Sequence, residues 1–253
     1  RERCDFVVVT IFVNPLQFGA GEDLDRYPSD LTGDLAQCEA EGVDCVFAPA
    51  RAEMYPRPVL TTVHVERLTE GLCGATRPTH FDGVATVVAK LFSIVGPSRA
   101  YFGRKDAQQL AVVRRMVADL DLPVEVIGCP LVREADGLAM SSRNEYLTDD
   151  ERRAATALSR GLQTVSAAVL DGERSAAAIR DLLVAPIASE PLLTLDYAEV
   201  VDASSLEPIT RLSGTVLVAV AVHAGRARLL DNATITFSDA GTSNGDDVTV
   251  DLG

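Results

Sequence analysis

The stretch that most constrains the fold is residues 99–109, which read Arg-Ala-Tyr-Phe-Gly-Arg-Lys-Asp-Ala-Gln-Gln. Its first four residues favour a β-strand, Gly103 interrupts that pattern, and from Asp106 apolar residues recur at helical spacing as far as Leu120. A strand that turns directly into a helix is the building unit of an open α/β sheet, where ligands bind beyond the carboxyl ends of the strands. The sequence therefore predicts an α/β fold with a ligand close to residues 103–106.

The side chains of this turn suit a phosphate-bearing ligand. Gly103 allows a close approach of the backbone, and the N–H groups at the start of the following helix favour an anion. Lys105, one of only two lysines in the chain, is a compact donor suited to phosphate. Asp106 can accept from ribose hydroxyls or cap the helix, and Gln109 lies on the same helix face. A glycine turn with a solvated Lys–Asp pair explains the stretch equally well.

Two amides follow the first apolar run of the chain. Residues 4–13 are rich in β-branched side chains and predict a buried parallel strand, which Pro15 ends. Asn14 and Gln17 then fall where such a sheet presents its ligand groups, and their uncharged donors and acceptors suit a small hydroxy acid. An ordinary Asn-Pro turn is an equally good interpretation of this segment.

Two further polar segments are candidates for ligand contacts. Arg77 and His80 lie at the start of an apolar helix predicted over residues 81–95, where a histidine is more often a structural hydrogen-bonder than a catalyst. Residues 141–143 (Ser-Ser-Arg) offer two hydroxyls, backbone N–H groups and an arginine guanidinium. These donors suit the binding of a phosphate. An ordinary capped loop accounts for an isolated Ser-Ser-Arg more simply.

Composition limits the partners that the chain can have. The 253 residues carry a net charge of −14, which argues against general binding to nucleic acids or to anionic membranes. No apolar run reaches the length of a membrane span. The five cysteines are scattered and lack metal-ligand spacing, so we expect reduced thiols in a cytoplasmic protein and no protein metal site.

Hydrophobic periodicity and turn residues predict the remaining elements. Helices are expected over residues 31–41, 81–95, 149–170 and 175–188, and strands over residues 4–13, 43–48, 61–66, 99–102, 124–128, 194–202, 215–223, 227–231 and 233–237. The character of the chain changes near Pro130. We therefore expect a Rossmann-like domain over residues 1–131 and a smaller α+β lid domain over residues 132–253, with residues 238–253 a disordered tail.

Four segments in register resemble a known family. Residues 12–19, 77–84, 102–109 and 136–144 look like those of pantothenate synthetase (pantoate–β-alanine ligase), in that family's order and at its spacing. The resemblance implies a Rossmann-like nucleotidyltransferase fold and an ATP-dependent ligase. Pantoate would attack the α-phosphate of ATP, and β-alanine would then displace AMP from pantoyl adenylate. The resemblance also implies Mg²⁺ with the nucleotide and a homodimer in the cytoplasm.

The same resemblance implies roles for individual residues. Gln17 and Gln109 resemble the pantoate-binding glutamines, and Asn14 lies beside them. Arg77 and His80 would be further substrate contacts. The nucleotide site implied in this way consists of Gly103, Arg104, Lys105, Asp106, Val132, Met140, Ser141, Ser142 and Arg143. The lysine and the Ser-Ser-Arg loop would be the catalytic groups, because they stabilise charge on the phosphates.

Three departures from the family pattern are visible. Arg104 stands where the family usually has Glu, and Ala107 stands where an aromatic residue is usual. By the resemblance, the H-x-G-H segment and its central strand would precede residue 1, and none of the three histidines replaces it. We therefore expect a longer native product, poor folding of this chain alone, and unpaired facing strands at residues 6–13 and 99–102. A catalytically impaired fragment and another adenylate-forming nucleotidyltransferase are alternative interpretations.

Overall fold

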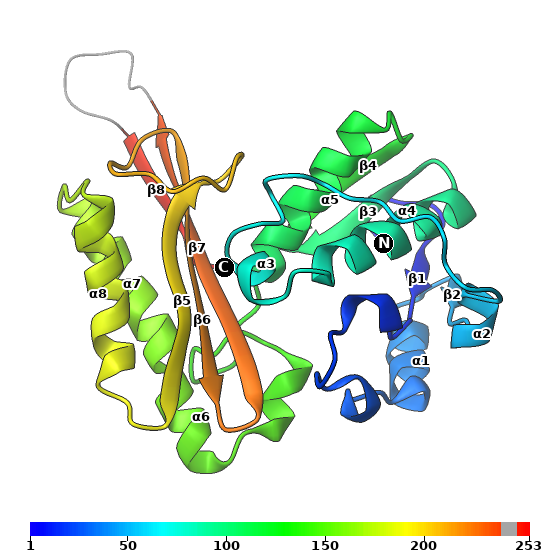
Figure 1. Ribbon diagram of the computed structural model, residues 1–253, viewed down its shortest axis with the longest axis horizontal. Helices are drawn as coiled ribbons and strands as arrows, with labels where there is room; N and C mark the ends of the chain where they lie inside the picture. The colour runs from blue at the N-terminus through cyan, green and yellow to red at the C-terminus, as the bar shows by residue number, and fades with distance from the viewer. Residues whose placement is uncertain (239–246) are drawn as a thin grey trace.

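The computed structural model describes residues 1–238 and 247–253. The first part of the chain forms two parallel strand pairs, as Figure 1 shows. Its elements in chain order are β1 (Val8–Thr10), α1 (Leu31–Ala40), β2 (Cys45–Phe47), α2 (Arg51–Met54), α3 (Cys73–Thr76), α4 (His80–Val95), β3 (Ser98–Gly103), α5 (Ala107–Asp119) and β4 (Val124–Cys129). β1 pairs with β2 and β3 pairs with β4, with a helix in each connection, so this part has the predicted α/β character.

Helices α1 and α4 begin and end close to the predicted residues, where capping and glycine residues occur in the sequence. The Asp30 carboxylate accepts a hydrogen bond from the Gly33 N–H and caps α1, and Gly42 follows the helix with a φ of +67°. α4 ends at Gly96, which has a φ of +83°. Glycine adopts this left-handed conformation without the steric cost of a Cβ atom, so both helices stop where the sequence places a glycine.

The N-terminal strand pair is shorter and more exposed than predicted. β1 is much shorter than the predicted strand at residues 4–13, none of its residues is fully buried, and Phe6 is 65% exposed. The prediction of a buried strand is wrong because, in the described ranges, β1 pairs only with β2. No strand forms over residues 61–66, since the Val63 N–H donates to the Thr86 hydroxyl of α4 (2.9 Å) instead of to a strand.

β1 and β3 belong to separate sheets, which confirms the expectation that these two strands are not hydrogen-bonded to each other. Residues that precede β1 lie beside β3. The Arg99 guanidinium donates to the Arg3 carbonyl (3.2 Å), and the Cys4 thiol lies 3.6 Å from the Tyr101 hydroxyl. The N-terminal residues therefore contact β3 through its side chains.

The second part of the chain is a four-stranded antiparallel sheet with two long helices on one face (Figure 1). Its elements are α6 (Asp149–Ala155), α7 (Ala157–Leu170), α8 (Ala176–Ala188), β5 (Leu193–Asp202), β6 (Thr215–Ala224), β7 (Ala227–Ser238) and β8 (Asp247–Asp251). Thr148 and Glu151 form a capping box before α6. The single helix predicted at 149–170 is wrong, because the chain divides at Thr156, whose N–H bonds to the Arg153 carbonyl in a tighter turn.

Two predictions for the sheet are also wrong. The strands predicted at 227–231 and 233–237 are one continuous strand, because Asn232 keeps its place in the ladder opposite Ala219. The tail predicted to be disordered contains β8, whose backbone pairs with β7. The rest of that tail prediction, residues 239–246, lies outside the described residues.

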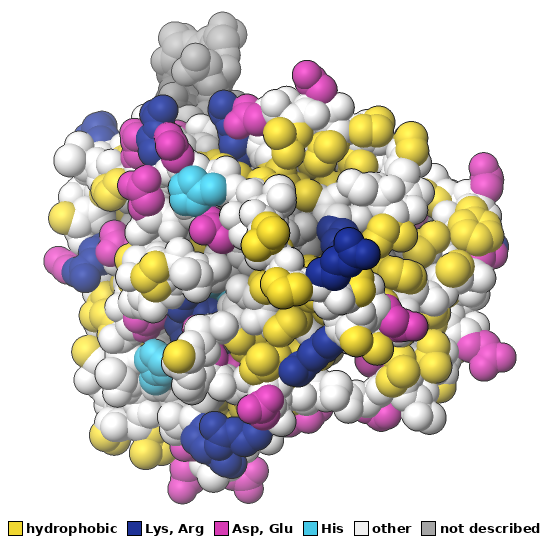
Figure 2. All heavy atoms as spheres, turned by 45° about the vertical axis from the view of Figure 1, so that its right-hand side comes forward, with side chains coloured by type: hydrophobic (Ala, Val, Ile, Leu, Met, Phe, Trp, Pro, Cys, Tyr) yellow, Lys and Arg dark blue, Asp and Glu magenta, His cyan; other side chains and the backbone are white. Residues whose placement is uncertain are grey.

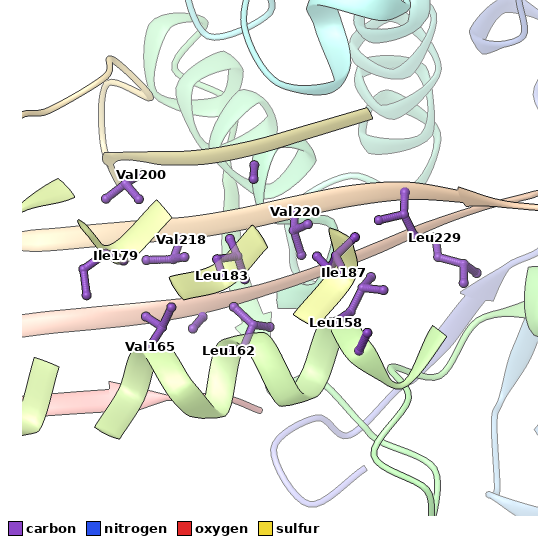
Figure 3. Packing of buried hydrophobic residues seen from close by; sticks show 14 of the residues in the cluster. Leu158, Leu162, Val165, Ile179, Leu183, Ile187, Val200, Val218, Val220 and Leu229 are labelled. Atoms are coloured by element: carbon purple, nitrogen blue, oxygen red, sulfur yellow. The ribbon is translucent and has the colours of Figure 1, made fainter. Parts of the chain in front are cut away.

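Two clusters of buried apolar residues stabilise the molecule. The first lies between α7, α8 and the sheet, and Figure 3 shows Leu162, Leu183 and Val218 among the side chains that meet there. The second surrounds α4 and α5 and includes Leu217 and Ala219 of β6. Because successive side chains of a strand point to opposite faces, β6 contributes to both clusters and joins the two parts of the chain. Among the described residues, no helix has the length and apolarity that a membrane span needs.

Candidate functional site

The turn after β3 is the first element of the candidate site. β3 ends at Gly103, Arg104–Asp106 form one short 3₁₀ turn, and α5 begins at Ala107. The Asp106 carboxylate makes no capping hydrogen bond, so the helix-capping role considered for it is wrong. The Lys105 ammonium lies 4.0 Å from that carboxylate, with the lysine side chain 19% exposed and the aspartate side chain 48% exposed. The turn therefore presents a largely buried cation beside a solvent-facing carboxylate.

A buried asparagine of β7 holds the backbone of this turn. The Asn232 amide donates to the Arg104 carbonyl (3.1 Å) and to the Lys105 carbonyl (2.8 Å). These bonds occupy two carbonyl oxygens of the turn and fix its position against the antiparallel sheet. Asn232 is not among the site residues predicted from the sequence, because it falls between the two strands predicted at 227–231 and 233–237. An amide inside an otherwise continuous strand is the signal that could have identified it.

Two adjacent glutamines at the start of α5 have different surroundings. Gln108 is buried: its amide oxygen accepts from the Cys73 N–H (2.9 Å), and its amide nitrogen donates to the Leu68 and Gly71 carbonyls (2.9 and 2.8 Å). Gln109 is half-buried, and its side chain has no hydrogen-bond partner in the described part of the chain. Gln108 thus fastens α5 to the α3 segment, whereas the amide of Gln109 is available to a ligand.

Asn14 orients the neighbouring Gln17. Its amide nitrogen donates to the Gly83 carbonyl (3.0 Å) and to the Gln17 side-chain oxygen (3.1 Å), and its oxygen accepts from the Tyr55 hydroxyl (2.8 Å) and the Leu16 N–H (3.3 Å). An asparagine side chain offers two N–H donors and two lone pairs, and the protein uses all of them. Asn14 is therefore a positioning residue for Gln17.

Arg77 and His80 support the backbone of Gln17. The Gln17 carbonyl accepts from His80 Nδ1 (2.8 Å) and from the Arg77 guanidinium (3.2 Å), and Arg77 also forms a two-pronged ion pair with Glu22 (2.7 and 2.5 Å). A carbonyl only accepts, so Nδ1 carries the ring proton, and Nε2 accepts from Arg77 (3.2 Å). Burial, and then the charge of Arg77, lower the pKa of His80 to about 4, so the ring is neutral.

The Ser-Ser-Arg loop is fixed by residues from the start of the chain. The Ser141 hydroxyl caps a short 3₁₀ helix by accepting from the Arg143 N–H (3.3 Å), and the Ser142 hydroxyl donates to the Tyr27 hydroxyl (3.3 Å). Arg143 donates two bonds of 3.0 Å to the Asp23 carboxylate. Burial opposes the charge of Arg143, but the bonds to Asp23 outweigh it and raise the pKa of this guanidinium.

The hairpin that leads to this loop contains the other two predicted residues of the nucleotide site. The Met140 N–H donates to the Val132 carbonyl (2.9 Å), which joins the two arms of the hairpin. Both side chains are exposed, Val132 by 59% and Met140 by 57%. One lone pair of the Val132 carbonyl is therefore in use, and the exposed Val132 side chain faces solvent.

Residues 19–30 link Arg77 to the Ser-Ser-Arg loop, because Glu22 pairs with Arg77 and the adjacent Asp23 pairs with Arg143. β7 contacts both the 104–106 turn and the turn at 142–146. The candidate residues thus surround the junction between the parallel strands and the antiparallel sheet. Because the resemblance assigns both Gln17 and Gln109 to pantoate, it predicts that their side chains share one pocket, and this stays a prediction.

Comparison with known proteins identifies the family. The family model described as pantoate-beta-alanine ligase matches residues 1–234. This chain belongs to that family. The pantothenate synthetase of Heliobacterium modesticaldum is 57% identical over 93% of this chain and 84% of its own length. That of Acetivibrio thermocellus is 53% identical over the same shares of the two chains.

Solved structures of the family have the same fold. A crystal structure of pantothenate synthetase from Thermus thermophilus matches with a TM-score of 0.87 and 48% identity, covering 90% of this chain and 83% of its own. The pantoate-beta-alanine ligase from Francisella tularensis, described as complexed with beta-gamma ATP and beta-alanine, matches with a TM-score of 0.74 and 30% identity, covering 91% and 80%. The resemblance and the fold class inferred from the four sequence segments are therefore confirmed.

Proposed function

We propose that this protein is an ATP-dependent ligase that joins pantoate to β-alanine through a pantoyl adenylate, releasing pyrophosphate and then AMP. The observation that carries the proposal is the family match over residues 1–234, together with relatives named pantothenate synthetase that share about half of its residues. The Francisella relative, complexed with beta-gamma ATP and beta-alanine, supports ATP and β-alanine as two of the substrates.

In this proposal, the 103–106 turn and the 140–143 loop bind ATP. A Cβ atom added to Gly103 would meet nothing within 4 Å, so the backbone of the turn is open to a phosphate. Lys105 contacts the phosphates, Asp106 the ribose and the Val132 backbone the adenine. The hydroxyls of Ser141 and Ser142, with Arg143, complete the phosphate site, and Met140 leads into it.

Mg²⁺ accompanies the nucleotide in this proposal. The described residues contain no group of three histidine, cysteine or acidic side chains that could hold a metal ion. Magnesium in nucleotide sites is commonly bound by substrate phosphates and water, with few protein ligands. In this proposal the metal arrives with ATP.

Pantoate lies between Gln17 and Gln109 in this proposal. Asn14 fixes the orientation of the Gln17 amide, while Arg77 and His80 fix the Gln17 backbone. These three residues therefore act on pantoate through Gln17. A pocket that pairs amides with the pantoate hydroxyl and carboxylate would reject an analogue lacking the hydroxyl, because a buried amide would lose its partner.

The reaction needs charge stabilisation at the α-phosphate. The carboxylate of pantoate attacks the phosphorus, the bond to pyrophosphate breaks, and negative charge grows on the phosphoryl oxygens. Lys105, Arg143 and the N–H groups of the 103–106 turn are donors of the kind that stabilise such charge. The amine of β-alanine then attacks the acyl carbon, and AMP leaves.

The larger organisation is also part of the proposal. We place the boundary between a Rossmann-like domain and a lid domain at residues 131 and 132. A homodimer is supported by exposed apolar residues of the first part, such as Leu60 (95% exposed) and Ile94 (49%). Figure 2 shows hydrophobic side chains gathered over the face that this part presents. A cytoplasmic location is supported by the five cysteines, which are free thiols.

The test uses the whole chain with ATP, Mg²⁺ and pantoate, with and without β-alanine. We expect pyrophosphate release that requires pantoate, and pantothenate, detected by mass spectrometry, only when β-alanine is present. Release of pyrophosphate without pantoate would indicate a different adenylate-forming enzyme. Binding of ATP with no pyrophosphate release would overturn the ligase assignment.

A further inference from the structure

A strand outside the family match reaches the proposed nucleotide site. The match ends at residue 234, and β8 pairs antiparallel with the end of β7, from Asp251 opposite Thr234 to Asp247 opposite Ser238. Figure 1 places the end of the chain between the antiparallel sheet and the helices of the first part. Residues 247–253 therefore lie at the junction where the candidate residues gather.

The carbonyl of Leu252 completes the bonding of a largely buried arginine. Arg133 donates to both oxygens of Asp231 (2.7 and 3.0 Å), to the Gly137 carbonyl (3.1 Å), and twice to the Leu252 carbonyl (2.6 and 2.9 Å). A guanidinium has five N–H donors, and these contacts use every one of them. Without Leu252, two donors of a side chain that is only 18% exposed would lose their partner.

The neighbouring aspartate holds the 103–106 turn. One oxygen of the Asp251 carboxylate accepts from the Arg104 guanidinium (2.5 Å), and the other accepts from the Gly253 N–H (2.9 Å). A Cβ atom added to Gly253 would come within 2.5 Å of the Leu131 Cβ, so the backbone of residue 253 packs directly on Leu131. The same short segment thus touches the turn on one side and residues 131–133 on the other.

We propose that residues 247–253 are a strap that fixes the 103–106 turn relative to residues 131–133, with Asp251 as a positioning residue that acts through Arg104. The inference rests on the proposed function only where it concerns ATP. Pairing with Asp251 ties the Arg104 side chain to the sheet and neutralises its charge. Lys105 is then the cation of the turn that meets the phosphates, at a position set jointly by the strap and by Asn232.

Amide hydrogen exchange of the full chain without ligand tests the strap directly. In Asp251→Asn the ion pair loses its charge, and we expect exchange over residues 103–109 to become roughly twofold to fivefold faster, as for the loss of a partly exposed ion pair. Asp251→Glu keeps the charge and should restore protection. The matched control is Asp119→Asn, which removes the exposed partner of Arg115 on α5 and should leave these residues unchanged.

Two further measurements distinguish the structural role of the strap from its effect on ATP binding. Arg104→Gln should reproduce the effect of Asp251→Asn on exchange, and the double variant should add nothing, because the two residues act as one pair. The ATP dissociation constant, measured by calorimetry at high salt to screen the opposite charge changes of the two variants, should rise by a similar factor in each. Unchanged exchange over residues 103–109 in Asp251→Asn would overturn the strap. A wild-type chain that does not bind ATP would instead overturn the proposed function, and the exchange data would still decide the strap.

Discussion

Loss of the Lys105 side chain should affect the rate of the reaction more than it affects the free energy of unfolding. The one ion pair of Lys105 in the described chain is with the Asp106 carboxylate at 4.0 Å, and its charge also counters the rise that burial causes in the pKa of Asp231, which Arg133 already pairs. We expect Lys105→Ala to slow pyrophosphate release by an amount equivalent to roughly 2–4 kcal/mol, as for the loss of one preorganised donor. The urea-unfolding free energy should change by less than this, because the one ion pair that is lost is long and half exposed.

The only other lysine provides the control for this variant. Lys90 donates to the Met54 carbonyl and lies over the Tyr55 ring, so its role is structural. Lys90→Ala should lower the unfolding free energy and leave the rate of pyrophosphate release per folded molecule intact. A wild-type rate in Lys105→Ala would remove this residue from the mechanism.

His80 should make stability depend on pH. Burial and the Arg77 charge lower its pKa from 6.5 to about 4, so between these values the unfolded chain binds more protons and stability rises with pH. The contribution is complete above pH 6.5 and is lost as the pH falls to 4. At 1.36 kcal/mol per pH unit, the difference from 6.5 to about 4 amounts to roughly 3 kcal/mol.

Replacing the ring with an amide isolates this contribution. His80→Asn keeps an N–H for the Gln17 carbonyl but takes up no proton, so its unfolding free energy should fall by roughly 2 kcal/mol less than that of the wild type between pH 7.5 and pH 5. His64→Asn should change the pH dependence in the opposite sense, because a hydrogen bond to Asp82 raises the pKa of His64. An identical pH dependence in His80→Asn and wild type would contradict the neutral, buried ring.

At the scale of elements, the capping box before α6 is the simplest signal to test. The Thr148 hydroxyl accepts from the Glu151 N–H (3.3 Å), and the Glu151 carboxylate accepts from the Thr148 N–H (2.9 Å). Thr148→Ala should lower the urea-unfolding free energy by about 1 kcal/mol. Thr164→Ala, in the middle of α7 and exposed, is the control and should be neutral or slightly stabilising, because alanine favours a helix interior. Equal effects of the two substitutions would contradict a capping role.

Local signals of this kind are the ones that the sequence predicts well. Asp30, Thr148 and the glycines after α1 and α4 act on backbone groups a few residues away, so their effects follow from the sequence alone. The pairing of β8 with β7 depends on backbone groups that meet only in the folded sheet, and a polar composition gave no sign of it. Composition therefore favoured disorder where long-range pairing produces a strand.

At the scale of the whole molecule, some residues of the candidate site can be predicted from the sequence and others cannot. Four short segments identified the family, because their spacing is fixed along the chain, and they predict the residues of the two loops. The groups that hold those loops come from elsewhere: Asn232 on β7, Asp251 on β8 and Asp23 before α1. Each was an ordinary polar residue in its own segment. Their roles become visible only when the two parts of the chain are placed together.

The contact between the two parts should also decide global stability. Arg228 of β7 pairs with Asp196 of β5 (2.6 Å), and its guanidinium lies 3.5 Å from the Cys73 sulfur of α3, which belongs to the core around α4 and α5. The two side chains of the ion pair are only 17% and 10% exposed. Removing one charge leaves the other buried and uncompensated, so Asp196→Asn should cost about 3–5 kcal/mol in urea-unfolding free energy.

The shape of the thermal unfolding transition tests whether the loss of stability in Asp196→Asn extends to both parts of the chain. Because β6 contributes side chains to both cores, we expect one calorimetric transition that moves as a whole in Asp196→Asn. Asp150→Asn removes the partner of Arg153 from a pair in which both side chains are more than 70% exposed, and should change stability by less than about 0.5 kcal/mol. A transition that splits into two, with only the antiparallel part destabilised, would show that the two parts unfold independently and that the Arg228 contact does not couple them.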